Sequence, residues 1–208
     1  MLNATTADSN TAVGYASLDA NTTGTRNTAI GDNALGGNTT AHDNVAVGRA
    51  ALLTSTTGER NTAVGKSAGN DTTTGSNNSI FGFHAFYDNT TGGNNVAIGY
   101  EALVKNTTAN DNTGVGYQAL RQNTTGAGNV AVGYVALDAN TTASANTAIG
   151  QHALTDNTTG ASNTAVGSGA LGDNTTADNN VAVGVNALRV NTTGASNTAV
   201  GSLALDAN

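Results

Sequence analysis

An asparagine recurs every 17 residues along this chain, without insertion or deletion, from Asn10 to Asn197. If that Asn is counted as position 0 of a coil, position 4 is Gly in all twelve copies. Positions 12 and 13 are Thr-Thr in every copy that the chain completes, and the unit reads N-[TV]-A-[VI]-G-x-x-A-L-x-x-N-T-T-[GA]-x-x. A fixed period is the signature of a repeat architecture, so it constrains the fold class more than any local feature does.

Each unit reads as one coil of a parallel β-solenoid. Seventeen residues are too few for a helical hairpin repeat, whose units run to roughly 33–47 residues. Position 1, where apolar (as in Val45 and Val96), alternates with the apolar position 3, which is strand periodicity. Gly and Asn segments supply the turns. The pattern predicts two short strands and two turns per coil, with positions 3 and 8 facing inward and a rod on the order of 58 Å long at about 4.8 Å per coil.

The unbroken register indicates one continuous array over residues 1–208, with partial coils at both ends. Partial coils expose unpaired strand edges, which predicts lateral or end-on self-association. Position 2 is Ala in ten copies, with Ile80 and Gly114 as the exceptions. If position 3 faces inward, this Ala stripe faces outward and suits close packing against another rod. Complete units start at Asn10, Asn27, Asn44, Asn61, Asn78, Asn95, Asn112, Asn129, Asn146, Asn163 and Asn180.

Charge and hydropathy exclude several classes of partner. The net charge is −7, and the seven Lys and Arg residues occupy no fixed position, whereas phosphate binding needs a clustered basic face. No run approaches the roughly 20 apolar residues that span a bilayer. The first ten residues, MLNATTADSN, lack the basic and apolar regions of a signal peptide. We therefore expect no nucleic-acid partner and no membrane insertion, with export through a longer precursor or another route such as virion assembly.

The distribution of ionisable residues argues against catalysis. Acid–base and nucleophilic chemistry need dissimilar groups that converge in a pocket, but here every ionisable residue falls at a variable position of the unit. His84 and His152 share position 6 yet lie four coils apart, roughly 19 Å at strand spacing. No spacing typical of metal ligands occurs. We expect no enzyme activity, no cofactor and no metal.

Asparagine occupies two columns with different expected roles. The Asn residues of position 0 are predicted to stack into a ladder that also satisfies turn backbone groups. Those of position 11 begin N-T-T, a full N-glycosylation acceptor predicted on an exposed turn. Alternatively, the Thr pair stacks well by itself, as Ser55-Thr56-Thr57 suggests by keeping the pair without the Asn. The candidate acceptors are Asn21, Asn38, Asn89, Asn106, Asn123, Asn140, Asn157, Asn174 and Asn191, together with Asn3, Asn70 and Asn77 outside that register.

Aromatic residues interrupt the monotony of the array at position 5. Phe83, Tyr100, Tyr117 and Tyr134 follow one another on four consecutive coils. Such a stripe can bind the faces of sugars or another chain, but it is more often self-stacking surface or interface filler. It is the candidate binding or interface stripe of this chain.

The units N-T-A-V-G, N-V-A-V-G and N-T-A-I-G, each followed by an Ala, resemble the head repeats of trimeric autotransporter adhesins. The longer form N-T-A-V-G-x-x-A-L-x-x-N-T-T-G is similar to arrays in phage tail fibres and in surface proteins that end in a self-cleaving chaperone domain. The resemblance covers essentially the whole chain. It implies a left-handed parallel β-roll that assembles as a homotrimer and works outside the cell or on a virion as a stalk or head that touches receptors.

Two classes of function compete at this point. The first is a structural segment of an extracellular fibre, coated with glycans if the N-T-T acceptors are filled. The second is a binding module that recognises glycan, a host receptor or even ice through a repetitive face. Adjacent Thr residues point to opposite sides of a strand, which leaves one outward Thr column and disfavours ice. In either case the expected main partner is the chain itself, as a trimer or a head-to-tail filament.

Overall fold

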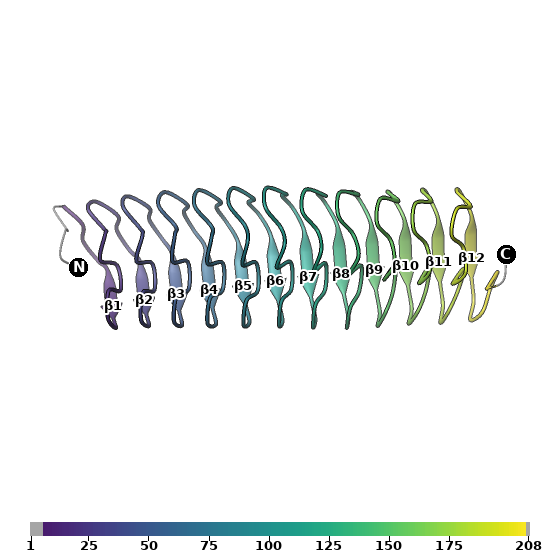
Figure 1. Cartoon of the computed structure of the whole chain (residues 1–208), viewed down its shortest axis with the longest axis horizontal. Coiled ribbons are helices and arrows are strands. Elements are labelled where there is room, and N and C mark those ends of the chain that lie inside the picture. The colour runs from purple at the N-terminus through teal and green to yellow at the C-terminus, as the bar shows by residue number, and fades with distance from the viewer. Residues whose placement is uncertain (1–5, 207–208) are drawn as a thin grey trace.

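The structure is a computed structural model that describes residues 6–206, and it confirms the predicted all-β parallel solenoid. Stacked coils form one elongated rod with β1 and β12 at opposite ends (Figure 1). Each coil contributes one strand to a single 12-stranded sheet in chain order. The strands are Thr11–Val13 (β1), Thr28–Ile30 (β2), Val45–Val47 (β3), Thr62–Val64 (β4), Ser79–Phe81 (β5), Val96–Ile98 (β6), Thr113–Val115 (β7), Val130–Val132 (β8), Thr147–Ile149 (β9), Thr164–Val166 (β10), Val181–Val183 (β11) and Thr198–Val200 (β12).

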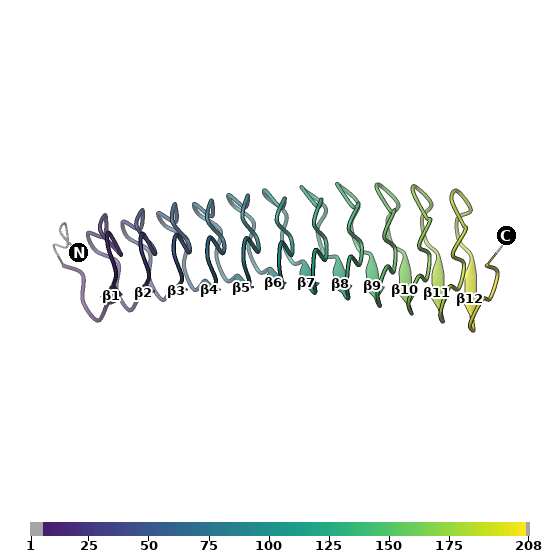
Figure 2. The same ribbon diagram turned by 60° about the horizontal axis from the view of Figure 1, so that its bottom comes forward.

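All neighbouring strands are parallel, and their register repeats the sequence period. Thr113 of β7 pairs with Val130 of β8, and each later residue pairs with its equivalent one coil on. The second view shows the same strands side by side along the rod (Figure 2). Residues at the same position of the 17-residue repeat are therefore stacked in a column along the rod.

The predicted second strand of each coil is wrong, because the Ala-Leu segment forms turns. Residues at positions 6 and 8 adopt left-handed backbone, as Gln118 (φ 55) and Leu120 (φ 54) do, which no regular strand accommodates. Cross-coil backbone hydrogen bonds still hold this segment: the N–H of Leu120 donates to the carbonyl of Ala136 at 3.0 Å. A left-handed Leu costs about 1–2 kcal/mol. Because the Leu120 side chain is fully buried, hydrophobic burial of roughly 1.5–3 kcal/mol offsets that strain.

The inward face of the strand is the opposite of the one predicted. Position 2 is buried, as Ala29 and Ala131 show, whereas Val13 at position 3 is 57% exposed. The Ala stripe is thus core and not a rod–rod contact, while Leu at position 8 faces inward as expected. The physical reason is the narrow space between strand and Leu turn. Where Ile80 occupies position 2, the neighbouring coil has Gly69, and a Cβ on Gly69 would lie only 2.8 Å from the Ile80 Cδ1.

The invariant Gly of position 4 has a steric cause. Gly116 has φ +137, and a Cβ there would collide with the backbone carbonyl of Gly133 in the next coil. The chain turns at this point while neighbouring backbones touch, so no side chain fits. This requirement explains why position 4 never varies.

The ladder predicted at position 0 is confirmed, with rungs that run mainly from side chain to backbone. The Oδ1 of Asn112 accepts the N–H of Asn129 at 2.9 Å. The Nδ2 of Asn129 crosses the coil and donates to the carbonyl of Ala143, also at 2.9 Å. The rod interior therefore has a polar part, hydrogen-bonded in most coils, beside the apolar part built from Ala and Leu.

Candidate functional site

The Asn residues of position 11 lie inside the rod. The side chain of Asn123 is fully buried. Its Nδ2, the atom that a glycan would modify, donates to the Oδ1 of Asn106 at 3.1 Å and to the carbonyl of Gly126 at 2.9 Å. That same carbonyl accepts the Nδ2 of Asn112 at 2.9 Å. Two Asn columns thus converge on the position-14 carbonyl, which the sequence pattern alone does not reveal.

This burial overturns the prediction that the N-T-T turns present acceptors to solvent. The amide must leave the core to carry a glycan, because its Nδ2 already bonds inside the rod. Asn70 is also buried, and its Nδ2 donates to the carbonyl of Ala50 at 3.2 Å. Asn77 is exposed, and Asn3 lies outside the described residues. The buried acceptors of position 11 are Asn21, Asn38, Asn89, Asn106, Asn123, Asn140, Asn157, Asn174 and Asn191.

The aromatic stripe forms a continuous stack along the rod. The ring centroids of Phe83 and Tyr100 lie 5.6 Å apart, and those of Tyr100–Tyr117 and Tyr117–Tyr134 each lie 5.2 Å apart, with the planes within 11° of parallel. The ring of His84 covers Phe83 at 3.9 Å. The faces of the rings therefore pack against one another, and mainly their edges meet solvent. This arrangement matches the self-stacking alternative.

The outer face of the sheet carries a column of apolar side chains at position 3. Parallel sheets are normally covered on both faces, but this one has its inner face on the core and its outer face uncovered. The exposed members of the column are Val13, Ile30, Phe81, Ile98, Ile149, Val183 and Val200. Position 1, which is Thr or Ser in eight coils and Val in four, lies beside it on the same face. The sheet thus presents a flat apolar strip along the rod.

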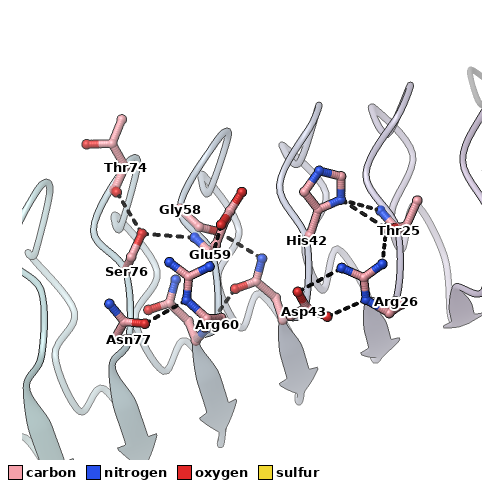
Figure 3. Close-up of polar contacts among 12 residues, drawn as sticks. Thr25, Arg26, His42, Asp43, Gly58, Glu59, Arg60, Thr74, Ser76 and Asn77 are labelled. Carbon is pink, nitrogen blue, oxygen red and sulfur yellow. Dashed lines mark hydrogen bonds and ion pairs between the residues drawn. The ribbon is translucent and has the colours of Figure 1, made fainter.

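A second edge of the rod, at positions 15 and 16, shows a period of two coils (Figure 3). The side chain of Ser76 accepts the backbone N–H of Glu59 at 3.0 Å, and that of His42 accepts the N–H of Thr25 at 2.9 Å. The same bond recurs from Gly93 to Asn110, from Ala127 to Ser144 and from Ala161 to Asp178. When coils are counted from Asn10, every acceptor belongs to an even coil. Sequence analysis missed this 34-residue unit, whose signal is the acceptor side chain at position 15 of alternate coils.

Ion pairs on this edge are exposed. Arg26 donates to both carboxylate oxygens of Asp43, at 2.6 and 3.0 Å. That hydrogen bonding lowers the pKa of Asp43 and raises the pKa of Arg26. Because both groups are open to solvent, the pair contributes little stability.

Over residues 6–206, no group of three or more His, Cys, Asp and Glu is placed to hold a metal ion. In the same part of the chain, no helix is long and apolar enough to cross a membrane. The residues that the sequence singles out lie apart: the aromatic stack is on the surface at position 5, and the Asn columns of positions 0 and 11 are in the core.

The fold and these surfaces define a tandem-repeat parallel β-solenoid with 17 residues per coil. Comparison with known proteins gave no matching family model, no matching curated protein and no matching solved structure. The functional argument therefore rests on the surfaces of the rod.

Proposed function

We propose that this chain is a structural segment of an extracellular fibre, and that it associates with further copies of itself through the outer face of its sheet. The observation that carries the proposal is the uncovered apolar column of position 3. Ile98 and Ile149 are 39% and 40% exposed on a face where polar residues would be expected in a solvated sheet.

The size of this face fits a self-association surface. Twelve coils at about 4.8 Å and a strip about 10 Å wide give on the order of 600 Å² in projection. This area includes the Thr and Ser residues of position 1, so its apolar part falls within the range of the largest apolar patches on monomers, roughly 300–600 Å², which are often functional. A second copy presents the same strip with the same coil spacing, so strands of both copies can meet in register along the whole rod.

The resemblance to adhesin head repeats supports the same proposal. It implies a homotrimer with a left-handed roll, positioned outside the cell or on a virion, and a trimer would cover the strip of every copy. Constant register adds stiffness, which a stalk requires. A glycan coat at position 11 is not part of the proposal, because those amides are in the core.

The test compares the chain with a variant carrying Ile98→Lys and Ile149→Lys on the outer face. We expect the parent chain to sediment as an oligomer at tens of micromolar, and the variant to sediment as a monomer of unchanged circular dichroism. Thr125→Lys with Thr142→Lys, on the exposed position 13, is the matched control and should remain oligomeric. Mass per length from electron micrographs then distinguishes trimer from filament. A monomeric parent chain would refute the proposal.

A further inference from the structure

Two cavities open on the side of the rod formed by positions 6, 9 and 10. One, of about 310 Å³, is lined by His84, Tyr87, Asp88, Glu101, Val104, Lys105 and Arg121. The other, of about 370 Å³, is lined by His152, Thr155, Ser168, Gly169, Gly172, Asp173, Asn186 and Arg189. Neither lies on the apolar strip of the sheet. We call them the Glu101 site and the Gly169 site.

The two sites are built from equivalent residues four coils apart. The segment HAFYDNTTG, which starts at His84, corresponds to HALTDNTTG, which starts at His152. Two coils further on, QALRQNTTG (residues 118–126) corresponds to NALRVNTTG (residues 186–194). Each site therefore has a His on its first coil, and a carboxamide and an Arg on its third coil.

In the Glu101 site, the carboxamide and the Arg hold a carboxylate of the chain itself. The Nε2 of Gln118 donates to the Oε2 of Glu101 at 2.8 Å, and the Nε of Arg121 donates to the same oxygen at 3.2 Å. An Arg that holds a carboxylate in this way is a common recognition arrangement. In this site, a carboxamide and an Arg on the same coil thus bind a carboxylate.

The Gly169 site retains an Arg and a carboxamide, with Asn186 in place of Gln118, but it has no counterpart of the Glu101 carboxylate. Gly169 and Gly172 stand where the other site has Glu101 and Val104. Arg189 is exposed and makes no ion pair with any described residue. Asn186 leans over Gly169, since a Cβ there would collide with its side-chain oxygen. The site therefore offers the Arg189 guanidinium to a carboxylate from outside the chain, and the side-chain oxygen of Asn186 to a hydrogen-bond donor.

Two further charged residues, Asp173 and Asp156, limit which kinds of ligand could bind in the Gly169 site. Asp173 occupies the place of Lys105, and it lines the cavity beside Arg189. Asp156, the counterpart of Asp88, is exposed on the first coil. A simple anion would meet these two carboxylates unfavourably, whereas a ligand with hydroxyl groups can donate hydrogen bonds to Asp173 while its carboxylate accepts from Arg189.

We propose that the Gly169 site binds an acidic sugar. Its carboxylate accepts hydrogen bonds from Arg189, as the Glu101 carboxylate does from Arg121 in the other site. Its hydroxyls donate to Asp173. The cavity of about 370 Å³ lies at the small end of ligand pockets, roughly 300–1,000 Å³, which suits a single sugar unit. The proposal is independent of the fibre proposal, because it uses another side of the rod.

The first test is a titration of the Ile98→Lys, Ile149→Lys variant, followed by NMR chemical shifts, with D-glucuronate, D-glucose and acetate as probes. We expect glucuronate to bind, and glucose and acetate to bind at least tenfold more weakly. Arg189→Gln should weaken glucuronate binding at least tenfold. Equal binding of glucose, or no effect of Arg189→Gln, would overturn the proposal. Because each titration is read from residues of this site, its result does not depend on whether the chain forms fibres.

The second test exchanges the distinguishing residue between the sites. Gly169→Glu supplies an internal carboxylate and should abolish binding. The left-handed backbone at this position accepts Glu, as Glu101 (φ 52) shows, and the Asn186 side chain must shift away from the new Cβ. In the other site, Glu101→Gly together with Lys105→Asp removes the internal carboxylate and supplies the counterpart of Asp173, and this change should raise the stoichiometry from one glucuronate to two. Thermal unfolding confirms that each variant is folded. Unchanged binding by folded Gly169→Glu would refute the assignment even if the Glu101→Gly, Lys105→Asp variant failed to fold.

Discussion

The Oδ1 of Asn38 is buried without a hydrogen-bond partner, because the equivalent residue of the next coil is Ser55. Where two consecutive coils both have Asn at position 11, that oxygen accepts the Nδ2 of the following Asn, as Asn89 accepts from Asn106 at 3.1 Å. The Oγ of Ser55 is itself buried and unpaired. One substitution thus leaves two unsatisfied polar atoms in the core.

Ser55→Asn should therefore stabilise the rod. The new amide would donate to the Oδ1 of Asn38 and to the carbonyl of Gly58, for a gain of about 1 kcal/mol in the free energy of unfolding. Urea denaturation measures it. The reverse change in an intact part of the ladder, Asn123→Ser, should cost about 1–3 kcal/mol. A destabilised Ser55→Asn variant would contradict this account of the polar core.

The large side chain of Ile80 fills the core space that the absent side chain of Gly69 leaves in the neighbouring coil. The effects of substitutions at these two residues on stability should therefore be coupled. Gly69→Leu restores the common residue of position 8 but places its side chain against Ile80, so we expect a loss of roughly 1–3 kcal/mol. Combining it with Ile80→Ala, the common residue of position 2, should recover most of that loss. A double-mutant cycle in urea measures the coupling. Additive effects would show that the two sites do not share space.

The two-coil period predicts that replacing Ser144 by Ala lowers the free energy of unfolding more than the same change at Ser162. Ser144→Ala removes the acceptor of the Ala127 N–H, bonded at 3.0 Å, and should cost about 1 kcal/mol. Ser162→Ala, at the exposed position 16 of the next coil, is the control and should have almost no effect. Thermal unfolding of both variants at one protein concentration distinguishes them.

The aromatic stack predicts that Tyr117 contributes more to the stability of the fold than Tyr15, which also lies at position 5. Tyr117 is stacked on both sides, at 5.2 Å from each neighbour, and pairs of this kind contribute about 0.5–1.5 kcal/mol each. Tyr117→Ser should therefore lose roughly 1–3 kcal/mol of stability. Tyr15, which is 81% exposed and stacks on no other described ring, should lose little as Tyr15→Ser. Equal losses would show that stacking adds nothing beyond the exposed ring itself.

Asp138 should make stability depend on pH. Burial raises the pKa of this carboxyl, with a smaller opposing effect of Arg121, and its Oδ1 has no hydrogen-bond partner. The folded state thus favours the protonated form. Its contribution is fully present below the unfolded pKa and is lost as the pH rises through the higher folded pKa. Asp138→Asn should raise the unfolding midpoint at pH 7, and the gain should shrink towards pH 3. A gain that is constant with pH would contradict this origin.

Much of the fold could be predicted because the period is a property of the sequence alone. Gly116 and its equivalents, the strand periodicity and the Leu of position 8 were sufficient to predict a parallel solenoid with 17 residues per coil. The stacking of Phe83 to Tyr134 follows from the same register, because equal positions must become neighbours in space. The candidate site was harder to predict, since Arg189 and Gly169 matter only beside the equivalent Arg121 and Glu101.

The sequence by itself determined the period, the parallel register and the columns of like residues. Only the tertiary structure decided which side of each column faces inward. Alternation places Ala131 and Val132 on opposite sides of a strand but does not say which is the core side. The Ala of position 2 faces the core because the space between the strand and the left-handed Leu turn is too narrow for Val. Asn123 likewise reads as an exposed turn residue, but it is buried, because inside the rod its amide finds two acceptors, the Oδ1 of Asn106 and the carbonyl of Gly126.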